Sequence, residues 1–141
     1  MQILFNSSEI IEAIDPTIID EPDQAIWRNI FPIKYAPDVN SEAKTYITLS
    51  MYSPRVEDNV YKEVRIGFHI FTHIDLQKMV TGDSRTDYIQ SEVDKLFNRN
   101  ENFGIGLLEL KANNELYVNE KYMGSTLWYE VTNFNSLSLK S

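Results

Sequence analysis

The chain has 141 residues, of which 43% are hydrophobic and 12% aromatic, so its length and composition predict about one folded domain. Cysteine is absent, which excludes disulfides, thiol nucleophiles and thiolate metal sites together. A formal net charge of −8 argues against direct binding to nucleic acid, which normally needs a basic patch, and permits an acidic surface along which a polyanion slides.

The N-terminal 40 residues predict two short helices and an extended connection. The first residues lack the basic region and the long apolar run of a signal peptide, so we expect the chain to stay where it is made. An N-cap pattern at Asn6 to Glu9 predicts a short helix that ends at Asp15-Pro16. Asp20-Glu21-Pro22 predicts a second helix start. One face of that helix would be apolar: Ile26, Trp27, Ile30 and Phe31. We interpret Trp27 as a core anchor, with an exposed partner contact as the alternative.

Two long strands are predicted next. Pro32 and Pro37 favour an extended connection. Apolar and polar residues then alternate, which predicts a strand over 44–52, a polar hairpin loop over 53–59 and an unusually long return strand over 61–74. One face of the return strand is apolar: Val64, Ile66, Phe68 and Ile70. The other face is only partly apolar: Arg65, Gly67, His69, Phe71 and His73.

The second half of the chain predicts one main helix followed by two strands. Residues 75–83 are typical of a loop, and a serine cap begins a helix over 85–97 whose apolar residues recur on one side. Strands are predicted over 105–110 and 127–134, with Asn113-Asn114 as a turn between them.

Together these elements predict an α+β fold. We expect a mostly antiparallel sheet of about four to five strands, with one main helix packed on it and short N-terminal helices. The domain would span residues 1–141, with a helical and extended segment (1–40), an α+β core (43–135) and a flexible tail (136–141). No run of about 18 apolar residues predicts a membrane-spanning helix.

The sequence offers no arrangement of residues that is typical of catalysis. His69 and His73 would lie about 13 Å apart on one strand, which is too far for a shared zinc ion. Gly104-Ile105-Gly106 has no lysine at Walker spacing, and no serine lies in a G-x-S-x-G elbow. We therefore expect no catalytic residue, metal or cofactor, while an enzyme that uses a carboxylate pair stays an alternative.

Four aromatic residues would share one face of the sheet: Tyr46, Tyr52, Phe71 and Trp128. Aromatic side chains anchor interfaces when they are exposed, and they form ordinary core when helices cover them. We favour the core for Trp128 and leave Tyr52 and Phe71 open.

Several stretches of the chain resemble one family. They are residues 62–73, 85–89, 93–98, 104–110 and 122–135. In the order of their predicted elements and in the general character of their sequence, they resemble the neck proteins of tailed bacteriophages, in particular the tail terminator or head-to-tail joining (tail completion) group. The resemblance covers about residues 43 to 135.

The resemblance implies a structural virion protein without catalysis. Such proteins assemble as homo-oligomeric rings, commonly of six subunits, and for this chain we expect a hexamer or a dodecamer. One side of the ring caps the tail tube, and the other side meets the head-side connector. DNA passes through the lumen without specific binding, and the ring forms in the host cytoplasm with no membrane involved. Another neck component (a head completion, stopper or collar protein) and a non-viral acidic protein-binding module remain alternatives.

Within such a ring, two loops and one strand are the candidate contact regions. The hairpin loop 53–59 and the loop 75–83 would reach neighbouring subunits, and the protruding end of the long strand would do the same. The candidate interface residues are Arg55, Glu57, Asp58, His69, Phe71, His73, Lys78 and Asp83.

Overall fold

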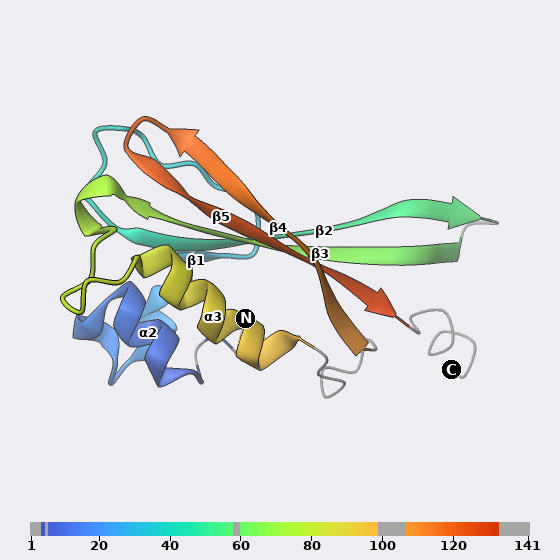
Figure 1. Ribbon diagram of the computed structural model, residues 1–141, viewed down its shortest axis with the longest axis horizontal. Helices are drawn as coiled ribbons and strands as arrows, with labels where there is room; N and C mark the ends of the chain where they lie inside the picture. The colour runs from blue at the N-terminus through green and yellow to red at the C-terminus, as the bar shows by residue number, and fades with distance from the viewer. Residues whose placement is uncertain (1–3, 5, 58–59, 99–106, 133–141) are drawn as a thin grey trace.

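The computed structural model describes residues 4, 6–57, 60–98 and 107–132, and for residues 52–57, 60–63 and 132 it describes the backbone alone. Five strands form one sheet in the order β1-β2-β3-β5-β4. The β1–β2 pair is parallel and the other pairs are antiparallel. Helices lie on one side of this sheet (Figure 1), which confirms the predicted α+β fold class.

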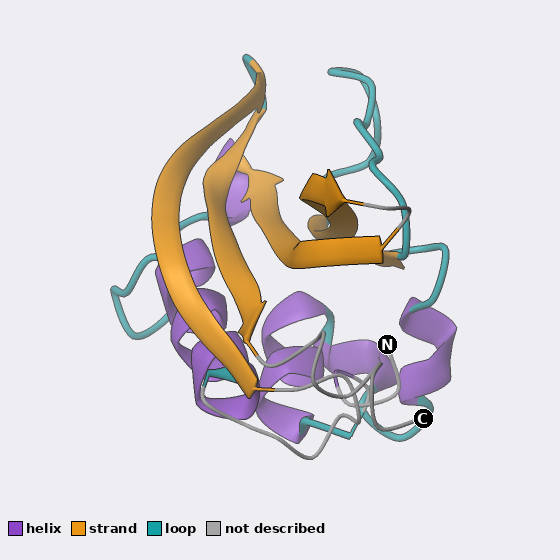
Figure 2. Cartoon of the chain, turned by 90° about the vertical axis from the view of Figure 1, so that its right-hand side faces the viewer, coloured by secondary structure: helices purple, strands orange, loops and turns teal. Residues whose placement is uncertain are grey.

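The strands are longer than the average of about 5–6 residues. Their bounds are β1 (Ile30–Phe31), β2 (Thr45–Glu57), β3 (Val60–His73), β4 (Leu107–Asn119) and β5 (Tyr122–Thr132). Strands of this length accumulate twist, and Figure 2 shows how strongly the strand directions differ across the sheet.

The predicted hairpin loop over 53–59 is wrong over most of its length. Strand β2 continues to Glu57 and pairs with β3 down to Glu57 opposite Val60, while Asp58 and Asn59 lie outside the described residues. The pairing register shifts between Tyr52 and Arg55. That irregularity accommodates Pro54, because a proline without an N–H is tolerated at bulges and unpaired edges.

The helix α2 (Ser8–Ile14) begins where the sequence predicts it, and the side chain of Ser7 accepts a hydrogen bond from Ile10 N at 3.3 Å. The helix α3 (Arg85–Phe97) matches its prediction residue for residue, and it buries Ile89, Val93 and Phe97 against the sheet. Short 3-10 helices complete the chain: η1 (Pro16–Ile18), η2 (Pro22–Ala25) and η3 (Ile74–Leu76).

The second predicted helix is wrong, because the chain leaves η2 at Ile26 and turns to join the sheet. Asn29 holds this turn against β2: its Nδ2 donates to Thr45 O at 2.9 Å, and its own carbonyl accepts from Ile47 N at 2.8 Å. These sheet contacts replace the helical hydrogen bonds that the apolar spacing suggested. Trp27 is consequently 58% exposed, so its interpretation as a core anchor is also wrong.

The predicted turn at Asn113-Asn114 is wrong as well. Both residues lie within β4, opposite Leu127 and Thr126, and the chain reverses between Asn119 and Tyr122. They are exposed at the edge of the sheet, where polar side chains discourage unwanted strand pairing.

Apolar side chains fill both faces of the sheet. One cluster packs between the sheet and the helices α2 and α3, and includes Phe68, Ile70 and Tyr129. A second, smaller cluster lies on the opposite side, which we call the far face, and consists of Phe31, Tyr46, Phe71 and Tyr122. Phe71 is 1% exposed, so this one of the two aromatic residues that the sequence left open belongs to the core, while the side chain of Tyr52 lies outside the described ones.

Candidate functional site

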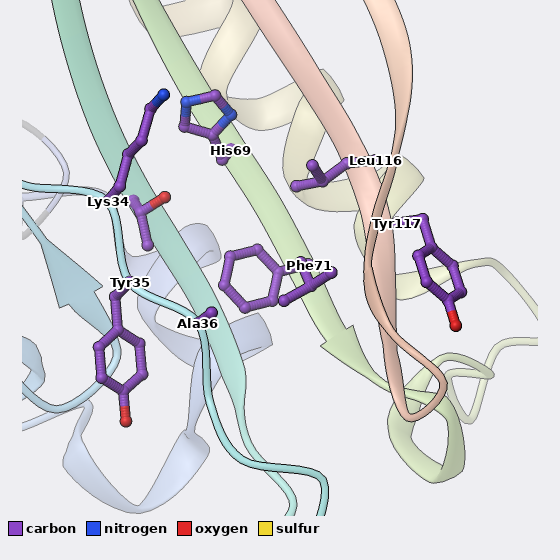
Figure 3. A pocket seen from close by; sticks show the side chains of 9 residues that line it. Lys34, Tyr35, Ala36, His69, Phe71, Leu116 and Tyr117 are labelled. Atoms are coloured by element: carbon purple, nitrogen blue, oxygen red, sulfur yellow. The ribbon is translucent and has the colours of Figure 1, made fainter.

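A groove of about 450 Å³ crosses the far face of the sheet (Figure 3). Its floor is formed by Thr48, His69 and Phe71. One wall is the connection Lys34–Ala36 and the other is Leu116–Val118 of β4. The groove therefore joins segments that are about 80 residues apart in the sequence.

Two long-range hydrogen bonds position the first wall. Asn119 Nδ2 donates to Pro37 O at 2.8 Å, and the Tyr122 hydroxyl donates to Glu42 O at 3.0 Å. Both donors lie at the β4–β5 reversal, so this hairpin holds the proline-rich connection over the far face. Tyr35 also stacks on Phe31, with ring centroids 4.2 Å apart, and this contact ties the wall to the aromatic cluster.

The polar centre of the groove is His69 on β3. Its Nε2 lies 2.9 Å from Ser50 Oγ on β2, and its Nδ1 lies 2.8 Å from Thr126 Oγ1 on β5. A neutral imidazole carries one donor and one acceptor, so it donates to one hydroxyl and accepts from the other. The three residues form a hydrogen-bonded row across three neighbouring strands.

Burial lowers the pKa of His69 below its usual value, and the positive charge of Lys34 lowers it further. The imidazole is therefore neutral at pH 7 and able to accept a proton, as a general base must be. A serine next to such a histidine is also the starting arrangement for nucleophilic catalysis. Here, however, the orienting group on the other nitrogen is a hydroxyl rather than a carboxylate, and β3 is paired on both sides at His69. Its backbone N–H groups are thus committed to the sheet and not free to bind an oxyanion.

Aromatic rings continue from the groove to the surface in one series. Edge-to-face and stacked contacts link Trp27 to Phe31, Phe31 to Tyr35 and Tyr46, and Tyr46 to Phe71. The inner members are buried, whereas Trp27 and Tyr35 are 58% and 41% exposed. The series therefore connects the far-face core to an exposed apolar surface at the β1 edge.

The predicted interface residues do not meet in one place. His69 and Phe71 lie in the groove, whereas Arg55 and Glu57 lie on the projecting end of β2. Lys78 and Asp83 are exposed on the loop between η3 and α3, and Asp58 lies outside the described residues.

His73 has a local structural role at the end of β3. It is 8% exposed, its Nδ1 accepts a hydrogen bond from Asp75 N at 3.1 Å, and its ring meets Tyr122 edge-on at 5.2 Å. The side chain thus caps η3 and covers the aromatic cluster. Its place in an interface stays a prediction.

The sequence nominated only His69 and Phe71 of the groove residues, and three of those that it missed have a charged or aromatic side chain: Lys34, Tyr35 and Tyr117. The first two lie in a connection whose prolines predicted only its extended form. Tyr117 lies in the part of β4 beyond Asn113-Asn114, where the asparagine pair had predicted a turn instead of a continuing strand. The one available signal was the Lys-Tyr pair between two prolines, which places a cation and an aromatic ring on an otherwise apolar connection.

Within the described parts of the chain, no group of three or more His, Asp or Glu residues is placed to hold a metal ion. None of the helices described there is long and apolar enough to cross a membrane.

Comparison with known proteins gives one match. No curated protein and no solved structure matches this chain. The model of the YomW family matches residues 2–131, which includes every described strand except the last residue of β5. The chain therefore belongs to the YomW family, a phage-derived protein family.

Proposed function

We propose that this phage protein is a structural component of the virion neck. It forms a homo-oligomeric ring that caps the tail tube and joins it to the head-side connector. The proposal combines the phage origin of the family, the resemblance of residues 43–135 to neck proteins, and one observation on the fold, which is the projecting end of the β2–β3 hairpin.

We call this projecting end, residues 53–57 of β2 and 60–63 of β3, the arm. Strand β3 pairs with β5 only from Val64 onward, and β1 pairs with β2 only at Ile47 and Thr48. Among the described residues, the arm strands therefore pair with each other alone, and Figure 1 shows them extending beyond the helices. The arm reaches roughly 15 Å past the sheet at about 3.3 Å per residue. A two-stranded ribbon is only marginally stable in water, so an arm of this length favours a stabilising neighbour.

The charge of the chain supports passage of DNA through such a ring. With 21 acidic and 13 basic residues, the chain carries excess negative charge, and we propose that acidic side chains line the lumen. Negative charge repels the phosphate backbone, so DNA moves through without being held, whereas a basic lumen would bind it through counterion release.

A role without catalysis is part of the same proposal. In the Ser50–His69–Thr126 row, both ring nitrogens of His69 have hydrogen-bond partners within the protein. The row spans three strands, so it stabilises the far face of the sheet. Interstrand pairs of this kind contribute to sheet stability. A stable, rigid sheet is what a ring subunit needs when it has to position loops on two partners.

The decisive experiment removes the arm without disturbing the sheet. Replacing residues 54–63 by an Asn-Gly turn leaves Ser53 opposite Val64, which continues the register set by Tyr52 and Arg65. A two-residue Asn-Gly loop is the preferred closure of such a hairpin. We expect circular dichroism and the melting temperature of the isolated protein to stay close to those of the wild type.

In a phage whose copy of the gene carries this replacement, we expect heads and tails to accumulate unjoined in electron micrographs of lysates. Wild-type protein supplied in trans should restore complete particles. Normal numbers of joined, infectious particles from the variant phage would refute the proposed role of the arm.

Another neck component is the second candidate, since the same arm suits a head completion, stopper or collar protein. The phenotype of a disabled gene separates the two. A missing tail cap leaves the tube end open to further growth and gives tails of irregular length. A missing head-side component leaves the tails uniform and the DNA in the heads unsealed.

A further inference from the structure

Trp27 adopts a backbone conformation that few residues other than glycine accept. Its φ angle is +60°, the one positive φ among the described non-glycine residues. For a bulky residue this conformation is strained, and such strain persists only where the surrounding structure enforces it. Strained residues cluster at functional sites, which makes the exposed indole of Trp27 a candidate contact.

The turn around Trp27 is held by hydrogen bonds on both sides. Trp27 N donates to Ile30 O at 2.9 Å, and Asn29 N donates to Ala25 O at 2.7 Å. The side chain of Asn29 fixes the same turn to β2. The turn therefore fixes the backbone from which the indole projects, and the indole itself meets Phe31 edge-on with ring centroids 6.0 Å apart.

The surface around Trp27 is apolar and basic. Ile33 and Tyr35 are 58% and 41% exposed beside it in the sequence. Residues 26–36 contain two basic residues, Arg28 and Lys34, and no acidic one, in a chain where acidic residues outnumber basic ones by 21 to 13. Arg28 Nη2 lies 3.7 Å from Asp15 Oδ2, and the Arg28 side chain stays 44% exposed in this ion pair. We call residues 26–36 the tryptophan patch.

A groove of opposite charge lies at the other edge of the sheet. It has a volume of about 540 Å³ and is bordered by the start of α3, by β4 and by β5. Its charged residues are Asp87 and Glu115, with no basic residue among those that line it. Its apolar residues include Tyr117 and Met123, which are 67% and 37% exposed. We call it the acidic groove.

We propose that the tryptophan patch of one copy docks into the acidic groove of the next, with Trp27 seated against Tyr117 and Met123. Arg28 then lies near Asp87 and Glu115 and shares its charge between them and Asp15 of its own copy, while Lys34 stays at the wall of the far-face groove and adds positive charge to the patch. Aromatic and arginine side chains are the residues that most often dominate interfaces, and complementary charge fixes their register.

The strand order makes this contact head-to-tail. β1 and β4 are the two edges of the sheet, so each copy offers the patch at one edge and the groove at the other. Contacts between different surfaces of identical subunits generate closed rings or open filaments rather than two-fold dimers. The inference rests on the proposed ring and assigns its subunit contact.

Cross-linking tests the contact directly, because the chain has no native cysteine. In the Arg28→Cys, Glu115→Cys double variant, a short bis-maleimide should give a ladder of trimers and larger species on denaturing gels. Each single variant should stay monomeric under the same conditions. A double variant that stays monomeric, or that stops at dimers, would overturn the head-to-tail contact.

Replacing the tryptophan separates assembly from folding. Trp27→Gly removes the indole and also relieves the positive φ, so we expect an unchanged or higher melting temperature together with at least a tenfold weaker self-association in light scattering. Ile19→Ala is the matched control, since Ile19 is 40% exposed and lies outside both surfaces. It should associate like the wild type. If Trp27→Gly self-associates as strongly as the wild type, the proposed contact is wrong.

The two proposals fail in different ways. If Trp27→Gly assembles normally and phage carrying it form joined particles, the contact is wrong while the neck role stands. If the wild-type protein self-associates through this contact but is missing from virions, the neck role is wrong while the contact stands.

Discussion

Substituting Gly124 by alanine is a severe test of the pairing of β3 with β5. Gly124 lies opposite Phe71 in the register of these two strands. A Cβ atom there would overlap the carbonyl oxygen of Ile70 and lie 2.7 Å from Phe71 Cα. These are backbone atoms of β3, which is paired on both sides and cannot move away.

The size of the effect follows from what has to move. Relieving the overlap requires β3 and β5 to separate by roughly 1 Å, which strains neighbouring hydrogen bonds worth about 1 kcal/mol each. Overpacking alone costs about 1–3 kcal/mol. We therefore expect Gly124→Ala to lower the free energy of unfolding by about 3–5 kcal/mol, a large share of the roughly 5–15 kcal/mol typical of a domain.

Two other glycines provide matched controls. A Cβ on Gly67 would meet the Trp128 ring at 2.7 Å, and a side chain can shift, so we expect a loss of about 1–2 kcal/mol. Gly82 has open space around it but a φ of +93°, so alanine there should cost about 1 kcal/mol. Urea denaturation followed by circular dichroism measures all three. A Gly124→Ala variant no less stable than Gly67→Ala would refute the β3–β5 register.

Three further predictions concern side chains with defined partners. Tyr129→Phe should cost about 1–2 kcal/mol in urea denaturation, because the buried hydroxyl donates to Asp94 Oδ1 at 2.7 Å, and an unchanged midpoint would contradict that bond. The pKa of His69 is lowered in the folded state, so the unfolded chain binds a proton at this imidazole more readily than the folded chain does. The free energy of unfolding should therefore fall as the pH drops through about 6.5, and it should level off below the pKa of His69 in the folded state. His69→Gln should flatten this dependence between pH 5 and 7, and a pH profile identical to that of the wild type would count against it. Arg85→Met should lower the melting temperature by several degrees, since Arg85 donates to Ala13 O at 2.6 Å and joins α2 to α3; an unchanged melting temperature would show that this link carries no stability.

Local signals were sufficient for the parts of the fold that depend on local contacts. Helix α3 was predicted to the residue, because its cap and its one-sided apolar spacing lie within the helix itself. Strand β3 was predicted within one residue at each end for the same reason, since its alternation runs through its whole length. The β2 side of the arm, residues 53–57, was mistaken for a loop because Pro54 and its charged neighbours are typical of turns, while the pairing across the hairpin is not local.

The parts that depend on distant contacts were not predictable from local patterns. Residues 26–31 have the spacing of a helix, but the hydrogen bonds of Asn29 to β2 decide their conformation. The groove contains His69 and Phe71, which the sequence nominated, yet its walls depend on the bonds from Asn119 and Tyr122 to the connection that holds Tyr35. The spacing of apolar residues within one segment does not indicate a hydrogen bond to a distant segment.

The most direct test of the neck assignment is to locate the protein on the particle. Purified virions can be labelled with antibody and gold against this chain and examined by electron microscopy, with virions treated with pre-immune serum as the control. The proposal predicts gold at the junction of head and tail, with several copies per particle. Labelling elsewhere on the particle, or absence of the protein from virions with intact necks, would contradict it.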